Sequence, residues 1–96
     1  MDKEEIKRRI KENLPILKSK YQVEKLALFG SVARGSQTQT SDIDILVELE
    51  SPVGFFDFIR LEKFLSELLQ RKVDLVTRNA LKPLIRENIL REAIYV

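Results

Sequence analysis

Two aspartates, Asp42 and Asp44, lie two residues apart within an apolar stretch, and their type and spacing could support chemistry. If residues 42–48 form a β-strand, its period of two places both carboxylates on one face and the apolar side chains on the other. The apolar face can join a core, whereas the acidic face must stay hydrated, be paired or hold a metal ion. Two carboxylates about 4 Å apart repel by about 4 kcal/mol at an effective dielectric constant of about 20, and a divalent cation reverses this repulsion. The spacing alone favours neither a metal site nor an exposed strand that follows a capped turn.

A glycine-serine pair, Gly30-Ser31, precedes the two aspartates and follows the apolar run at residues 26–29. Such a turn at the end of a strand can present backbone N–H groups to an anion, especially where a helix starts at Ser31. Arg34 is a surface charge, the partner of an acid, or a phosphate ligand that uses its planar fork of donors. Gly35 is expected to serve the backbone conformation rather than to contact a ligand.

The chain has no histidine and no cysteine, which narrows the possible chemistry. Ser-His-Asp and Cys-His catalysis, zinc fingers and histidine general bases are excluded. Acid–base chemistry must therefore use Asp, Glu, Lys, Tyr or a metal-bound water, and a carboxylate site suits a hard cation such as Mg²⁺. The net charge of +2, from 17 basic and 15 acidic residues, is too small to indicate nucleic-acid binding by itself.

The length of 96 residues predicts one domain over residues 1–96. A composition of 44% hydrophobic and 33% charged residues is typical of soluble globular proteins. The apolar runs are too short to span a membrane, and residues 1–5 do not resemble a signal peptide. Together with the lack of cysteine, these features lead us to expect a cytoplasmic protein.

The hydrophobic pattern predicts alternating helices and strands. An apolar stripe predicts a helix over residues 2–20, capped by Asp2 and kinked or split at Pro15. Further helices are predicted over residues 55–70 and 81–93, the second capped by Asn79, and strands over residues 23–29, 42–49 and 72–77. Residues 36–41 read as a polar loop and residues 93–96 as a short extended tail. This order predicts an α/β sandwich with a small mixed sheet.

The motif Gly-Ser-x-Ala-Arg-Gly at residues 30–35, followed by Ser-Asp-x-Asp-x-x-Val at residues 41–47, resembles the signature of nucleotidyltransferases related to DNA polymerase beta. The small size resembles their smallest branch, the minimal nucleotidyltransferases (MNT). Members of that branch are often paired with a HEPN-domain protein in toxin–antitoxin modules. The resemblance extends over residues 3–96 and implies the α/β fold of this superfamily, in which helices pack on a small mixed sheet.

The resemblance also implies roles for particular residues. ATP would bind with its triphosphate at Gly30 and Ser31, with Arg34 as a further nucleotide contact. Two Mg²⁺ ions would bind to three catalytic carboxylates, which are Asp42, Asp44 and Asp74.

Asp74 is chosen as the third carboxylate because it matches the family pattern on a neighbouring predicted strand, and this residue would help to deprotonate the acceptor hydroxyl. From the residues alone, Asp74 can equally be a solvent-facing residue of an edge strand. Glu48 and Glu50 are weaker candidates for the third carboxylate.

The function that the resemblance implies is Mg²⁺-dependent transfer of AMP from ATP to a hydroxyl of a HEPN toxin, commonly on a tyrosine, with this chain as the antitoxin. One alternative is a non-catalytic antitoxin that neutralises a HEPN partner by binding. Either function is compatible with a homo- or hetero-oligomer. A nucleic-acid-directed transferase is a weaker alternative, because only a modest basic excess supports it and no aromatic stacking platform is visible.

Overall fold

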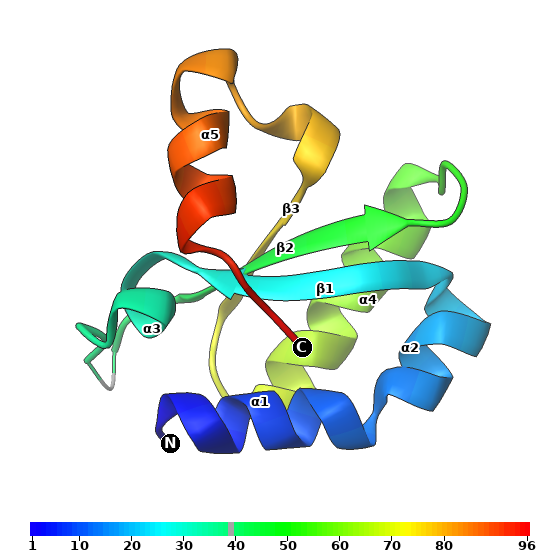
Figure 1. The fold of residues 1–96 in the computed structure, drawn as a ribbon. Coiled ribbons are helices and arrows are strands. Elements are labelled where there is room, and N and C mark those ends of the chain that lie inside the picture. The colour runs from blue at the N-terminus through cyan, green and yellow to red at the C-terminus, as the bar shows by residue number, and fades with distance from the viewer. Residues whose placement is uncertain (39) are drawn as a thin grey trace.

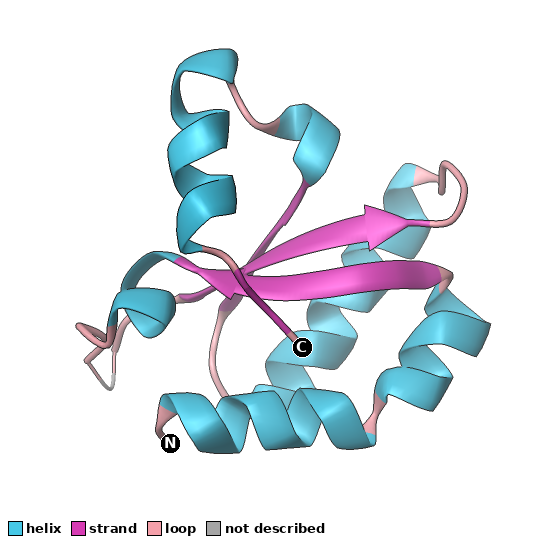
Figure 2. Cartoon of the chain, viewed as in Figure 1, coloured by secondary structure: helices cyan, strands magenta, loops and turns pink. Residues whose placement is uncertain are grey.

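The computed structural model describes residues 1–38 and 40–96, so Gln39 of the predicted polar loop lies outside the described residues. Helices and strands alternate along most of the chain (Figures 1 and 2). The helices are α1 (Lys3–Glu12), α2 (Leu14–Tyr21), α3 (Gly30–Arg34), α4 (Phe55–Leu69), the short 3₁₀ helix η1 (Arg78–Ala80) and α5 (Pro83–Glu92). The strands are β1 (Val23–Phe29), β2 (Ile43–Leu49), β3 (Val73–Thr77) and β4 (Ile94–Tyr95).

The strands form one mixed sheet in the order β3-β2-β1-β4. β1 is antiparallel to both β2 and β4, whereas β2 and β3 are parallel. A parallel pair needs a long crossover, and α4 provides it. The prediction of helices packed on a small mixed sheet is confirmed. β4 is too short to have been predicted as more than an extended tail.

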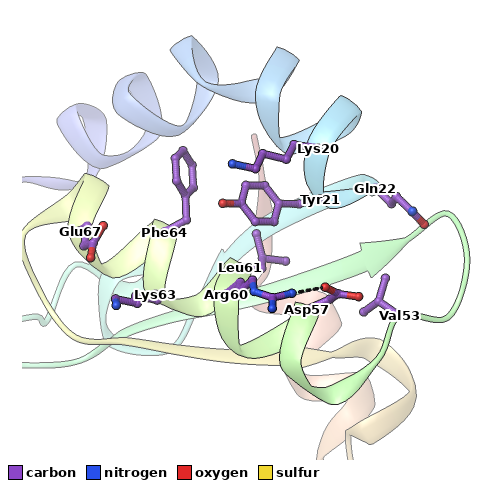
Figure 3. A pocket seen from close by; sticks show the side chains of 10 residues that line it. All are labelled: Lys20, Tyr21, Gln22, Val53, Asp57, Arg60, Leu61, Lys63, Phe64 and Glu67. Atoms are coloured by element: carbon purple, nitrogen blue, oxygen red, sulfur yellow. Dashed lines mark hydrogen bonds and ion pairs between the residues drawn. The ribbon is translucent and has the colours of Figure 1, made fainter.

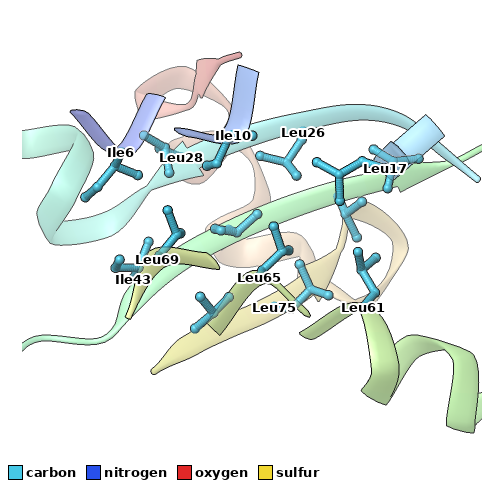
Figure 4. Packing of buried hydrophobic residues seen from close by; sticks show 14 of the residues in the cluster. Ile6, Ile10, Leu17, Leu26, Leu28, Ile43, Leu61, Leu65, Leu69 and Leu75 are labelled. Atoms are coloured by element: carbon cyan, nitrogen blue, oxygen red, sulfur yellow. The ribbon is translucent and has the colours of Figure 1, made fainter. Parts of the chain in front are cut away.

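One face of the sheet is covered by α1, α2 and α4 (Figure 1), and the main core lies between these helices and the sheet (Figure 4). Alternate strand residues point into this core, as the period of a strand requires. Full burial of one such aliphatic side chain contributes about 1.5–3 kcal/mol. The fully buried large side chains of this face include Ile6, Ile10, Leu17, Leu26, Leu28, Ile43, Ile45, Leu61, Leu65 and Leu69.

The opposite face carries a smaller apolar cluster beneath α5. Ala27 and Leu46 of the sheet are buried there together with Leu81, and partly buried residues of α5 pack against them. Asp44 belongs to this second face, because it alternates along β2 with the core residues Ile43 and Ile45. The apolar cover is therefore confined to part of the face, and the acidic residues lie beside it.

The outer edge of β3 is capped by side chains of α4. The backbone N–H of Val73 donates to the hydroxyl of Ser66 at 3.1 Å. The N–H of Leu75 donates to the carboxylate of Glu62 at 3.2 Å. Two edge N–H groups that lack a strand partner are thus satisfied within the fold.

The boundaries of two predicted helices differ from the expectation. The first predicted helix is split at Asn13, and Pro15 lies in the first turn of α2, where its missing N–H costs no hydrogen bond. The prediction that Asn79 caps the last helix is wrong, because Asn79 lies in η1 and Lys82 precedes the first residue of α5. Buried Leu81 holds an extended backbone, and Pro83 then favours a helix start. None of the helices in the described parts of the chain is long and apolar enough to cross a membrane.

Candidate active site

The parallel register of β2 and β3 places Asp44 directly opposite Asp74. Residues opposite each other on neighbouring strands project from the same face of the sheet. Asp74 is exposed and belongs to the edge strand, whereas Asp44 is half-buried on the adjacent inner strand. The structure therefore brings these two predicted site residues together from segments 30 positions apart in the sequence.

Gly30 packs against the carboxylate of Asp44. Phe29 is paired with Asp44 across β1 and β2, so the chain turns into α3 immediately above this side chain. A Cβ atom on Gly30 would overlap Asp44 Oδ2 and lie 3.0 Å from its Cγ. Gly30 also has φ +69°, a conformation that side chains rarely adopt. Glycine is required here for both reasons.

Gly35 ends the short helix α3 in a left-handed conformation, with φ +74°. A Cβ atom there would meet nothing within 4 Å. The N–H groups of Gly35 and Ser36 donate to the carbonyl groups of Val32 and Ser31, which closes the turn. The expectation that Gly35 serves the backbone conformation agrees with this geometry.

Burial raises the pKa of Asp44 above its ordinary value, and the negative charges of Asp74 and Asp42 raise it further. Arg34 acts in the opposite direction and lowers this pKa. Asp44 is thus repelled by both other acidic residues, and the guanidinium group of Arg34 opposes this effect. A bound cation would remove this repulsion.

Asp42 lies just before β2 and its side chain is half exposed. Its carboxylate is 3.8 Å from the ammonium group of Lys72, the residue that precedes β3. The backbone of Lys72 also accepts a hydrogen bond from Ile43 at 2.9 Å. These two contacts connect the start of β2 to the start of β3.

Arg71 is a residue of this region that the sequence analysis missed. Its guanidinium donates to the side chain of Gln37 at 2.6 Å, to the carbonyl of Thr38 at 3.0 Å and to the carbonyl of Ser41. These contacts hold both sides of the loop that links α3 to β2. Arg71 follows a helix and has no motif of its own, so no local sequence signal could identify it.

Arg34 is the partner of an acid, one of the three roles open from the sequence. Its Nη1 atom donates to Oε2 of Glu92, at the end of α5, over 3.3 Å. Arg34 remains about half exposed and still influences Asp44. Pairing with Glu92 uses only one of the five N–H donors of a guanidinium group.

Two weaker candidates for the third carboxylate lie away from Asp44 and Asp74. Glu48 accepts a hydrogen bond from the hydroxyl of Tyr95 at 3.2 Å and pairs with Arg78 at 3.6 Å. Glu50 is exposed beyond the end of β2. Glu48 thus connects β2 to the C-terminal strand.

The carboxylates suit a divalent cation by their chemistry, because hard cations prefer oxygen ligands. Within residues 1–38 and 40–96, however, no three acidic side chains converge closely enough to bind one ion together. Asp42 instead pairs with Lys72. The carboxylate oxygens are therefore of the type that a hard cation prefers, and the sheet register places Asp44 and Asp74 opposite each other.

The hollow in Figure 3 lies between α2 and α4, on the other side of the sheet. It has a volume of about 400 Å³ and contains the ring pair Tyr21 and Phe64, whose centroids are 5.2 Å apart. Lys20, Arg60 and Lys63 line it together with Asp57 and Glu67. Asp42, Asp44 and Asp74 do not line this hollow.

Comparison with known proteins shows the family of the chain. The family model described as nucleotidyltransferase domain matches residues 10–96. A Methanocaldococcus jannaschii protein, provisionally assigned as a protein adenylyltransferase, is 48% identical over 93 residues, which cover 96% of this chain and 95% of that protein. Protein adenylyltransferase MntA of Thermococcus cleftensis is 41% identical over 80 residues, covering 83% of this chain and 81% of its own length.

Solved structures show the same fold. A protein provisionally assigned as a minimal nucleotidyltransferase superposes with a TM-score of 0.84 at 39% identity, covering 98% of this chain and 95% of that one. A chain in the complex of tri-AMPylated Shewanella oneidensis HEPN toxin with MNT antitoxin gives a TM-score of 0.60 at 20% identity, covering 97% and 66% respectively. The glycine turn above two opposed aspartates is thus embedded in a chain that belongs to the nucleotidyltransferase domain family.

Proposed function

We propose that this chain transfers AMP from ATP to a hydroxyl group of a HEPN-domain toxin and thereby acts as its antitoxin. The observation that carries the proposal is the direct opposition of Asp44 and Asp74 beneath the Gly30 turn, in a member of the nucleotidyltransferase family. A tyrosine is the proposed acceptor residue. The reaction would draw on cytoplasmic ATP, and residues 1–96 would act as one catalytic domain.

The triphosphate would lie at the turn formed by Gly30 and Ser31, where backbone N–H groups can face phosphate oxygens. Because Gly30 has no side chain, the phosphates can approach the backbone and the carboxylate of Asp44 closely. Arg34 lies at the end of the same short helix and keeps free donors for a phosphate oxygen. These three residues would bind the nucleotide.

Asp42, Asp44 and Asp74 would hold the divalent cations, proposed to be two Mg²⁺ ions. Such ions neutralise phosphate charge and stabilise the attacking and leaving oxygens of an in-line displacement. Asp74 is exposed on the edge strand, so its carboxylate is accessible to an acceptor hydroxyl. It would accept the hydroxyl proton while the acceptor oxygen bonds to the α-phosphorus and pyrophosphate leaves.

The composition supports this assignment of roles. With no histidine or cysteine in the chain, the carboxylates are the natural acid–base groups at the site. The raised pKa of Asp44 reflects burial beside two other acids, an environment that favours cation binding. A separate protein is the proposed acceptor. MntA of Thermococcus cleftensis and the HEPN toxin–MNT antitoxin complex support a toxin in that role.

Antitoxin action by binding alone is the second candidate. It is favoured by the separation of the acidic side chains, which do not converge on one ion, and by the pairing of Asp42 with Lys72. In that case the acidic residues would be dispensable for neutralising the toxin. The two candidates therefore differ in a property that substitution can measure.

The test uses ATP labelled on the α-phosphate, Mg²⁺, a HEPN-domain toxin encoded beside this chain, and the Asp42→Asn/Asp44→Asn variant. The matched control is Asp57→Asn, an exposed carboxylate on α4 that pairs only with neighbouring Arg60 among the described residues. We expect label on the toxin with the natural chain and the control, and none with the double variant. Unlabelled toxin that is still neutralised by the double variant would establish the binding mechanism instead.

A further inference from the structure

The end of α5 meets the end of α3 through Arg34 and Glu92. These residues are 58 positions apart in the sequence, and Nη1 of Arg34 lies 3.3 Å from Oε2 of Glu92. Figure 1 shows α5 standing over the second face of the sheet, with the C-terminal strand crossing beside β1. Glu92 thus reaches the proposed nucleotide site from the last helix of the chain.

The backbone that carries Glu92 is firmly placed. Ala93 follows directly, and its N–H donates to the carbonyl of Ile89 at 2.9 Å. Ile94 then pairs with Leu28 as the first residue of β4. Ile89 and Ala93 also pack against the apolar cluster of the second face. The position of Glu92 is therefore set by helix, strand and core contacts together.

Arg34 has no comparable support from its own helix. α3 is a single short helical segment of 5 residues, and the Arg34 side chain is 54% exposed. The contact with Glu92 is its one hydrogen bond to another side chain among the described residues. A long, exposed side chain loses substantial rotamer freedom when it is ordered, so a preplaced acceptor reduces that entropic loss on ligand binding.

We propose that Glu92 is a positioning residue that holds Arg34 ready to bind the triphosphate. The inference rests on the proposed nucleotide function of the Gly30 turn. Glu92 engages a single N–H, which leaves the other donors of Arg34 available to phosphate oxygens. Glu92 itself contacts no substrate in this proposal and acts only through Arg34.

The test measures the dissociation constant of the full chain for AMP-PNP with Mg²⁺, and KM and kcat for ATP in toxin labelling. The variants are Glu92→Ala, Glu92→Gln and the matched control Glu87→Ala, which removes the exposed partner of Arg91 on the same helix. We expect Glu92→Ala to weaken AMP-PNP binding and raise KM about twofold to fivefold, as suits a half-exposed ion pair. kcat should change little, and Glu92→Gln should retain most of the affinity because it keeps an acceptor oxygen.

The Arg34→Ala variant tests whether Glu92 acts through Arg34. If Glu92 acts through Arg34, Glu92→Ala should have no further effect on AMP-PNP binding in the Arg34→Ala variant. A persistent effect would overturn the inference, as would tighter binding by Glu92→Ala, which would make Glu92 a competitor of phosphate. A chain that binds AMP-PNP but labels no toxin would refute the proposed transfer and leave this inference standing, whereas a chain that binds no AMP-PNP would refute both.

Discussion

Replacement of Gly30 by alanine tests whether this turn and Asp44 form one unit. The new Cβ atom would overlap Asp44 Oδ2 and lie 3.3 Å from Asp44 Cβ, so the carboxylate must move. The left-handed backbone adds about 1–2 kcal/mol of strain for a residue with a side chain. Displacing a packed, half-buried side chain adds about 1–3 kcal/mol. The expected loss in the free energy of unfolding is therefore about 2–5 kcal/mol.

Gly35→Ala is the matched control, because Gly35 has a similar φ of +74° but an added Cβ would contact nothing. It should lose only the conformational part, about 1–2 kcal/mol. Thermal unfolding followed by circular dichroism resolves the difference, since 1 kcal/mol shifts the Tm of a domain this size by about 4–8 °C. In an Asp44→Ala background most of the additional loss at Gly30 should disappear.

Activity should separate the two glycine variants further. A displacement of about 1 Å at a reacting group can reduce the rate by about a hundredfold, so Gly30→Ala should be far less active than Gly35→Ala at a temperature where both are folded. Labelling of the toxin measures this difference. Equal stability and equal activity of the two variants would refute the close packing of Gly30 on Asp44.

Four further perturbations test the electrostatics, the loop and the end of α4. Because the fold raises the pKa of Asp44 above its ordinary value of 3.8, the free energy of unfolding should fall as the pH rises from 3.8 through the raised pKa. Asp44→Asn should therefore be more stable than the natural chain at pH 7 and no more stable at pH 3. Mg²⁺ should raise the Tm of the natural chain, chelation should reverse that gain, and neither should affect Asp44→Asn; an equal response of both would contradict a metal role. Arg71→Met should lower the free energy of unfolding by about 1–3 kcal/mol and reduce labelling of the toxin, as measured by chemical denaturation and the labelling assay. Arg60→Met removes an exposed ion pair and should change the stability and the labelling little. Gln70→Gly should raise the free energy of unfolding by about 0.5–1 kcal/mol, because φ is +55° at this helix end; an unchanged denaturation midpoint would argue against that strain.

The local sequence pattern was sufficient to predict most helices and strands. Alternation in residues 42–49 correctly separated Asp44 from the buried Ile43 and Ile45, because the period of a strand is two. The register between two strands that are distant in the sequence cannot be read from the local sequence pattern. The direct opposition of Asp44 and Asp74 therefore became visible only in the register of the sheet.

Contacts between distant segments could not be predicted from the residues. Arg71 and Glu92 are ordinary charged residues in helical or turn sequences, and their partners are 30 or more positions away along the chain. The start of α5 was misplaced for a similar reason. Burial of Leu81 against the sheet outweighs the capping preference of Asn79, and burial depends on the tertiary structure.

The capped edge of β3 limits how another protein can approach the acidic site. Edge strands with free N–H groups invite pairing with a strand of a second chain, which is a common route to aggregation and to peptide capture. Ser66 and Glu62 already occupy two such groups, so an incoming strand would have to displace hydrogen bonds made by α4. Asp74 belongs to this same strand and faces outward from the sheet. An acceptor would consequently approach the face of the sheet with a projecting side chain. It would not add to the edge of the sheet as a further strand.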